Sequence, residues 1–398
     1  MGLLKIFIYI YLLLRPYYFF PSGNLQISDI ILLFGFTIFL LLNMKDRSMI
    51  RKIINENKYY LFFMIFVFII NSIYYITYLD FGFLLSTSYY LFNFFIILIF
   101  SYLIDDDKFI LGLDKIMKFN LFVQLLLCIF KIGDNWLGTY RYMGTFNDPN
   151  QFAYFILISY CFLFLLKQKN GIKTNLFIYL IICVYLIIES VSTGMLVGIG
   201  IVSALSIIDI IKFLPTFIKK NIKSIILTIY IVSIILVGML ILINIKPEYK
   251  ERISTTLSNV KILERISEKV SKTDKNNNND DIWHDRCYDI IFSYPEYTVY
   301  GAGQGNYARF IERTGHSCEV HATLPSILFY YGIIPTLILI VWVYRKIKGL
   351  EFKSLIVYIA LFAESFTLLN QRQALFWIII LLGSQFKTTE EAQHEEEK

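Results

Sequence analysis

The residues best suited to chemistry in this sequence gather between positions 283 and 335. This segment holds three of the four histidines, and His321 follows Glu319 by two positions at the start of an apolar run. An imidazole accepts a proton near neutral pH, and a neighbouring carboxylate raises its basicity. The pattern predicts that His321 acts as a general base, oriented or assisted by Glu319. The alternative is a structural histidine at a helix end.

A second polar group lies at positions 141 to 150, with the sequence Arg-Tyr-Met-Gly-Thr-Phe-Asn-Asp-Pro-Asn. Asp148 is a favoured N-cap residue and Pro149 suits the first helical position, so a helix should begin here. The free N–H groups and positive dipole end of that helix, together with Arg141, would attract an anion. An ordinary helix cap with an arginine at the membrane surface is the alternative.

Long apolar segments must position these two groups. The chain has 398 residues, of which 57% are hydrophobic and 17% charged, whereas about a quarter are charged in soluble proteins. Apolar runs recur along the chain, each long enough to cross a hydrocarbon core of ~30 Å. The sequence therefore predicts an all-α integral membrane protein with about twelve transmembrane helices. Their expected positions are 3–20, 27–43, 59–79, 83–104, 114–133, 150–167, 174–190, 194–210, 223–245, 322–344, 353–369 and 374–386.

Basic residues set the orientation of these helices. Of the 37 lysines and arginines, 22 fall in alternate short connections and the two tails, which predicts that both termini are cytoplasmic. The long connection at 246–321 then faces outward. We expect an N-terminal bundle of about nine helices over 1–245, an extracytoplasmic loop over 246–321, three helices over 322–386 and a disordered, acidic cytoplasmic tail over 387–398.

The extracytoplasmic loop has internal patterning. Residues 249–270 place apolar side chains three and four positions apart, which is typical of an amphipathic helix on the membrane surface or packed within the loop. Cys287 and Cys318 flank the polar segment; they could pair in an oxidising compartment, and otherwise they are free thiols. The glycine run 301–305 resembles a phosphate-binding loop or simply shapes the chain. The sequence contains no cofactor fingerprint and no metal-spaced set of Cys and His.

Arginine is distributed unequally between the two expected sides. Three of the cytoplasmic basic residues are arginines, whereas eight arginines fall on the outer side. A guanidinium grips phosphate oxygens through two parallel hydrogen bonds, while lysine acts as a point charge. The bias predicts a phosphate-bearing ligand at the outer face; ordinary ion pairing is the alternative and better explains positions 252 and 265. The outer arginines are Arg15, Arg141, Arg252, Arg265, Arg286, Arg309, Arg313 and Arg372.

Taken together, these motifs resemble the O-antigen ligase and polymerase superfamily (Wzy-type) of bacterial surface-polysaccharide synthesis. The similar segments are 141–153, 301–307 and 320–334, in that order, with one large outer loop before the last three spans. The chain departs from the family pattern at Ala322, where Asn is frequent, and at Ser192 and Thr193, where a Ser-Arg pair is frequent. Arg309 or Arg372 could supply the missing cation.

The resemblance implies an inverting, metal-independent glycosyltransferase of the bacterial cytoplasmic membrane, with its active site on the outer side. Donor and acceptor would be undecaprenyl-diphosphate-linked oligosaccharides, without nucleotide sugar, cofactor or nucleic acid. A chain-length regulator and a flippase would be partner proteins. The expected catalytic residues are Arg141, Arg286, Glu319 and His321. The expected residues for binding diphosphate or substrate are Asn147, Asn150, Asn306, Arg309, Arg313 and Arg372.

Three functions remain open at this point. A polymerase that joins lipid-linked repeat units into O-antigen or capsule is the first prediction. A ligase that moves finished glycan to lipid A core or another surface acceptor is the alternative, since the motifs are shared. A lipid-linked oligosaccharide flippase is less favoured, because the sequence shows no internal repeat and its charges fall mostly at span ends, with Glu364 the clearest exception.

Overall fold

The computed structural model describes residues 1–20, 26–44, 47–136, 140–168, 172, 174–204 and 286–386. Several predictions lie outside these residues. They are the span at 223–245, the amphipathic helix at 249–270 with Arg252 and Arg265, and the acidic tail at 387–398.

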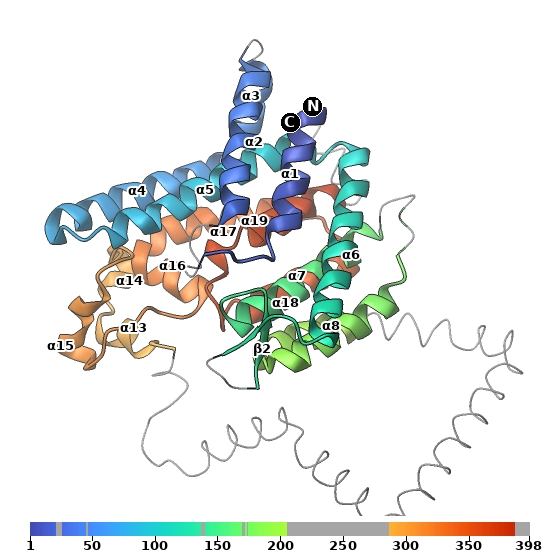
Figure 1. The fold of residues 1–398 in the computed structure, drawn as a ribbon. Coiled ribbons are helices and arrows are strands. Elements are labelled where there is room, and N and C mark those ends of the chain that lie inside the picture. The colour runs from blue at the N-terminus through green and yellow to red at the C-terminus, as the bar shows by residue number, and fades with distance from the viewer. Residues whose placement is uncertain are drawn as a thin grey trace, which may run out of the picture. The chain divides into compact units, whose positions relative to one another are not determined.

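The described residues up to 204 form helices and one short hairpin (Figure 1). Their elements are α1 (Gly2–Leu14), α2 (Ile27–Asn43), α3 (Arg47–Glu56), α4 (Lys58–Tyr78), α5 (Gly82–Leu103), α6 (Asp107–Ile129), β1 (Asp134–Asn135), β2 (Tyr142–Gly144), α7 (Pro149–Leu166), α8 (Leu176–Ser190) and a helix over Thr193–Ala204. The two strands pair in the antiparallel direction, and no other strand is found in the described part of the chain.

The residues after 286 form shorter elements first and longer helices later. These are α13 (Asp289–Ser293), α14 (Tyr297–Tyr300), η2 (Tyr307–Phe310), α15 (Ile311–Thr314), α16 (Thr323–Tyr331), α17 (Ile333–Ile347), α18 (Phe352–Glu364), η3 (Asn370–Arg372), α19 (Ala374–Leu382) and η4 (Gly383–Phe386).

Three helices of the described residues are long and apolar enough to cross a membrane, namely α4, α5 and α7. Shorter apolar helices occur at α1, α2, α8, Thr193–Ala204 and Ala374–Phe386. The described part of the chain is therefore helical with almost no strand, as predicted, and its apolar helices suit a membrane protein. The three full-length spans found are fewer than the twelve or so expected.

The expected span at 322–344 is in fact two helices, α16 and α17, separated at Gly332. This glycine has a φ of +79°, which ends the first helix. A Cβ at this position would lie 2.5 Å from the carbonyl oxygen of Val299. The break thus lets the backbone of residues 299–301 approach the helix backbone closely, which hydropathy alone does not reveal.

Two further boundaries differ from the prediction. Residues 47–56, expected to be a connection, form α3, a polar amphipathic helix that buries Ile53. The expected span at 353–369 ends at Glu364, the last residue of α18, and a 3₁₀ turn follows at η3. Glu364 therefore lies at a helix end rather than within a continuous span.

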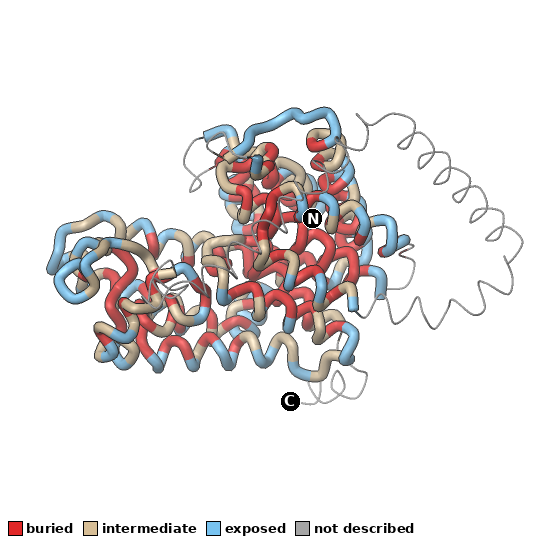
Figure 2. The backbone as a smooth tube through the Cα atoms, turned by 90° about the horizontal axis from the view of Figure 1, so that it is seen from below, coloured by how far each residue is buried: buried red, intermediate tan, exposed pale blue. Residues whose placement is uncertain are grey.

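An aromatic cluster joins four helices in the core. Tyr60 of α4 lies with its ring centroid 6.1 Å from Phe94 of α5, 5.2 Å from Trp342 of α17 and 5.0 Å from Trp377 of α19. The Trp342 Nε1–H donates to Asn57 Oδ1 at 3.1 Å, so the buried indole is satisfied. Figure 2 shows the buried residues on the inner faces of the helices, with exposed residues along the outer edges.

Candidate active site

One cavity brings together residues from distant parts of the sequence. Its volume is about 780 Å³, and all its lining residues belong to the compact unit formed by Met1–Val202 and Asp280–Lys398. Five of the expected site residues line it: Asn150, Arg286, Glu319, His321 and Arg372. These five residues place a histidine, two arginines, a carboxylate and an amide around one volume.

The wall of this cavity has a polar part and an apolar part. The start of α7, the segment from 319 to 321 and the residues around η3 supply polar groups. Leu33 of α2 and Leu85, Leu91, Phe92 and Phe95 of α5 supply apolar side chains. Such a combination suits an amphiphilic ligand with a polar head and a hydrocarbon portion.

His321 faces the cavity just before α16. Its backbone N–H donates to the carbonyl oxygen of Arg286 at 3.1 Å, so the segments that carry both residues are joined directly. Burial against the surrounding protein lowers the pKa of His321, Glu319 opposes this effect, and Arg286 reinforces it. Glu319 by itself makes His321 more basic, as expected. The sum of all effects nevertheless lowers the pKa of His321. A neutral imidazole at pH 7 can accept a proton.

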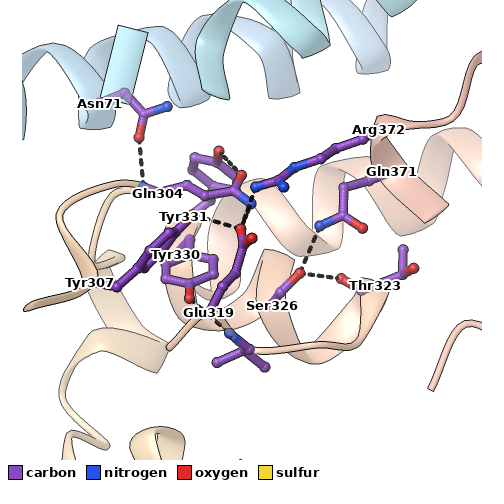
Figure 3. A network of polar contacts seen from close by, with 11 residues as sticks. Asn71, Gln304, Tyr307, Glu319, Thr323, Ser326, Tyr330, Tyr331, Gln371 and Arg372 are labelled. Carbon is purple, nitrogen blue, oxygen red and sulfur yellow. Dashed lines mark hydrogen bonds and ion pairs between the residues drawn. The ribbon is translucent and has the colours of Figure 1, made fainter. Parts of the chain in front are cut away.

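Glu319 is the centre of a hydrogen-bond network. Its Oε1 accepts from Gln304 Nε2 at 2.7 Å and from the Tyr307 hydroxyl at 2.6 Å, and it forms an ion pair with Arg372. Figure 3 shows Glu319 facing these partners. Gln304 is itself held, because its Oε1 accepts from the Tyr331 hydroxyl at 2.8 Å. This arrangement suits a carboxylate that holds neighbouring groups in place. It is less suited to a carboxylate that exchanges protons.

Arg372 is held in the 3₁₀ turn η3. Its guanidinium pairs with Glu319 and lies 5.3 Å from the ring centroid of Tyr89. Burial lowers the pKa of Arg372, but Glu319 and the nearby tyrosines outweigh this effect, so the pKa is raised. The side chain is therefore a permanent cation in the cavity wall.

Arg286 is positioned by contacts of both its side chain and its backbone. Its Nη1 donates to the carbonyl oxygen of Thr367, and its backbone carbonyl accepts from His321. The next residue, Cys287, forms a disulfide with Cys318, with a Cα–Cα distance of 6.2 Å. The pairing that the sequence left open is thus present, and it joins the segment of Arg286 to that of Glu319 and His321.

The disulfide has a histidine beside it. Cys287, His316 and Cys318 place their potential ligand atoms within 4.8 Å of one another. His316 Nε2 also lies 2.6 Å from Asp289 Oδ2. Because both sulfurs are bonded to each other, they are not available as thiolate ligands for a metal in this state.

The start of α7 has the predicted cap. Asp148 Oδ1 accepts from the backbone N–H groups of Asn150 at 2.7 Å and Gln151 at 3.0 Å, and Pro149 is the first helical residue. The carboxylate therefore occupies two of the N–H groups that were expected to attract an external anion.

Arg141 supports the cavity wall through Asn150. Its Nη2 donates to Asn150 Oδ1 at 3.0 Å, and its Nε donates to the Ser190 carbonyl at 3.2 Å. Ser192 also donates to Asn150 Oδ1, at 3.1 Å. Asn150 lines the cavity whereas Arg141 is not among its described lining residues, so Arg141 is a positioning residue here.

Asn147, Asn306, Arg309 and Arg313 do not line this cavity within the described structure. Asn147 Nδ2 donates to the Phe20 carbonyl at 3.0 Å. Asn306 precedes η2 with a left-handed backbone, at a φ of 45°. Arg313 pairs with Glu296 at 3.0 Å. Asn147 and Arg313 thus make local contacts at their observed positions, and Asn306 provides a turn before η2.

Arg309 lies among aromatic rings. Its guanidinium carbon is 4.6 Å from the ring centroid of Phe310 and 4.8 Å from that of Tyr74, and its Nη2 donates to Gly303 O at 2.6 Å. Burial lowers the pKa of Arg309. These contacts are typical of a cation that packs against aromatic faces.

The glycine run supports Gln304 by close packing. A Cβ on Gly303 would lie 2.6 Å from the Tyr74 ring, and one on Gly305 would lie 2.7 Å from the Phe83 backbone nitrogen. Gln304 N donates to Asn71 Oδ1 at 2.9 Å (Figure 3). Of the two roles left open for this run, its contacts fit the shaping of a loop.

Some cavity residues were absent from the sequence-based site. They include Arg15, Asp29, Tyr89, Gln151 and Gln373. Arg15 carried one usable signal, because it belongs to the arginines expected on the outer side. The others lie in helices or turns where a polar residue has many ordinary explanations.

Comparison of the chain with protein-family models, curated proteins and solved structures found no match.

Proposed function

We propose that this protein is a membrane glycosyltransferase that polymerises undecaprenyl-diphosphate-linked oligosaccharide repeat units into surface polysaccharide. The observation that carries the proposal is a single cavity that contains His321, Arg286 and Arg372 beside an apolar wall on α2 and α5. The resemblance to O-antigen polymerases and ligases supplies the substrate class. In this proposal the chain spans the bacterial cytoplasmic membrane about twelve times, with both termini inside and the cavity outside.

The proposed reaction is a direct displacement with inversion at the anomeric carbon. A hydroxyl oxygen of the acceptor sugar forms a bond to the anomeric carbon of the donor as the bond to the diphosphate oxygen breaks. The electron pair of that bond leaves with undecaprenyl diphosphate, and His321 takes the proton of the attacking hydroxyl. Its lowered pKa supports this role, since the imidazole is neutral before the reaction.

The cavity arginines stabilise the leaving group. Charge grows on the diphosphate as the glycosidic bond breaks, and fixed cations at that point contribute strongly to catalysis. Arg286 and Arg372 are held by Thr367 and Glu319 respectively, so they need little reorganisation. Glu319 acts in this proposal as the residue that positions Arg372, while Arg141 positions Asn150.

The test is a reconstituted assay with purified protein, lipid-linked repeat units and no other enzyme. His321→Ala should lower the polymerisation rate by about 10²- to 10⁴-fold, the usual contribution of a general base. The matched control is His316→Gln, because that histidine lies in the same outer segment and does not line the cavity. Polymerisation by His321→Ala at the wild-type rate would refute the base role.

A cellular measurement separates the alternative activities. Loss of a polymerase leaves single repeat units on undecaprenyl diphosphate. Loss of a ligase leaves long chains on the same lipid, because they are not transferred to the surface acceptor. Lipid-linked intermediates trapped in the inner leaflet would instead indicate a flippase. The length and leaflet of the lipid-linked glycan in a deletion strain therefore decide between these functions.

A further inference from the structure

Arg15 has an unusual position for an arginine. It follows α1 directly as its C-cap residue, and only 8% of its surface is exposed. It also lines the same cavity as Arg286 and Arg372. Arginine is seldom buried without strong partners, because removing the charge from water costs free energy. The contacts of Arg15 therefore indicate whether it serves the fold or a ligand.

The partners of Arg15 leave part of the guanidinium unused. Its Nη2 donates to Gln373 Oε1 at 3.2 Å, while its Nη1 has no hydrogen-bond partner among the described residues. Asp29 provides the nearest carboxylate, with 4.0 Å between Nη1 and Oδ1. Tyr18 also interacts with the guanidinium, through its hydroxyl and with its ring centroid 5.7 Å away. A buried donor of this kind is stabilised by an acceptor that enters the cavity.

Asp29 is also engaged in the N-terminal cap of α2. Its Oδ2 accepts from the backbone N–H of Gln26 at 2.9 Å, as part of the capping box of that helix. The carboxylate thus neutralises Arg15 only in part and competes with any anion for Nη1. Removing its charge should therefore favour anion binding at Arg15.

We propose that Arg15 is a third phosphate-binding residue of the cavity and that it makes the site prefer a diphosphate to a monophosphate head group. The inference rests on the proposed function, since it assigns a ligand to the same cavity. A terminal phosphate can be held by two arginines, whereas a diphosphate offers further oxygens that a third, separately anchored guanidinium can engage.

The experiment measures the affinities of purified protein in nanodiscs for undecaprenyl diphosphate, undecaprenyl monophosphate and undecaprenol. Arg15→Gln should weaken diphosphate binding by about 10- to 100-fold, as expected for a lost charge-assisted contact, and change monophosphate binding by less than about threefold. Asp29→Asn, which keeps an oxygen for the cap, should strengthen diphosphate binding. A merely structural role would not give these opposite effects.

Controls separate misfolding from loss of contact. Arg15→Lys keeps the charge but lacks the fork, so it should retain monophosphate binding and lose part of the diphosphate preference. Arg51→Gln, on the exposed part of α3, should leave all three affinities unchanged. Melting temperatures of each variant show whether it folds, and Asp29→Asn tests the idea independently if Arg15→Gln does not fold.

Different results would refute the role of Arg15 and the proposed function. If Arg286→Gln abolishes the preference for diphosphate while Arg15→Gln and Asp29→Asn both keep the wild-type ratio, the role of Arg15 is wrong and the site stands. If the wild type binds undecaprenyl diphosphate no better than undecaprenol, the proposed function itself is overturned.

Discussion

Arg372 and Arg309, both expected on the outer side of the membrane, have contrasting surroundings. Arg372 pairs with the Glu319 carboxylate in the cavity wall, and nearby negative groups raise its pKa despite burial. Arg309 lies among the rings of Tyr74, Phe83 and Phe310 and donates to a backbone carbonyl, and burial lowers its pKa. The two side chains have the same chemistry and the same expected side of the membrane.

The contrast lies in what surrounds each guanidinium. Arg372 is fixed by one carboxylate and still borders open volume, so its charge can act on a bound anion. Arg309 uses its guanidinium to fasten the glycine run to α4 and α5, and the aromatic faces occupy its surroundings. The residue type alone does not separate these roles, because a planar guanidinium suits both pairing with a carboxylate and packing on aromatic rings.

Among the tests of this comparison, the largest effect is expected from replacing each of these two arginines. Arg372→Gln should lower the turnover rate by about 10²- to 10³-fold, the loss typical of one fixed group that stabilises developing negative charge. Arg309→Gln should keep the turnover of folded protein within about threefold and lower its stability by about 1–3 kcal/mol. The reconstituted assay and thermal unfolding measure the two effects. Equal loss of turnover in both variants would contradict the comparison.

A smaller effect is expected from the disulfide between Cys287 and Cys318. The double variant Cys287→Ser with Cys318→Ser should lose about 3–4 kcal/mol of stability, since the bond closes a loop with a sequence separation of 31. It should also lower turnover about tenfold, because the segments of Arg286 and His321 are then joined less firmly. Unfolding and turnover are the measurements, and Cys183→Ser, at a buried free cysteine, is the control. Unchanged turnover would show that the backbone contact alone holds the two segments.

The smallest expected effect is a shift in pH dependence. Turnover should fall as the pH decreases through the lowered pKa of His321, because the protonated imidazole cannot act as a base. Arg286→Gln removes a nearby cation and should move this acidic limb to higher pH. Glu319→Gln removes a negative charge and should move it to lower pH. Profiles of kcat/KM against pH test these directions, and shifts of the same sign in both variants would exclude His321 as the group that titrates.

Local patterns in the sequence predicted several elements closely. The apolar run at 27–43 coincides with α2, and α4 and α5 each begin one residue before the expected position. Asp148 and Pro149 marked the start of α7, because capping and the fixed φ of proline act within a few residues. The break at Gly332 was missed because it depends on packing against Val299, which is distant in the sequence.

The composition of the sequence by itself determined a helical, strongly apolar protein, and its motifs singled out His321, Arg286 and Asn150 as candidates. Only the tertiary structure decided which candidates share a cavity, that Glu319 is held by Arg372, and that Arg309 packs among aromatic rings. It also added Arg15, which is more than 350 positions from its partner Gln373. Periodicity and capping are local properties, whereas the surroundings of a charge depend on contacts between segments far apart in the chain.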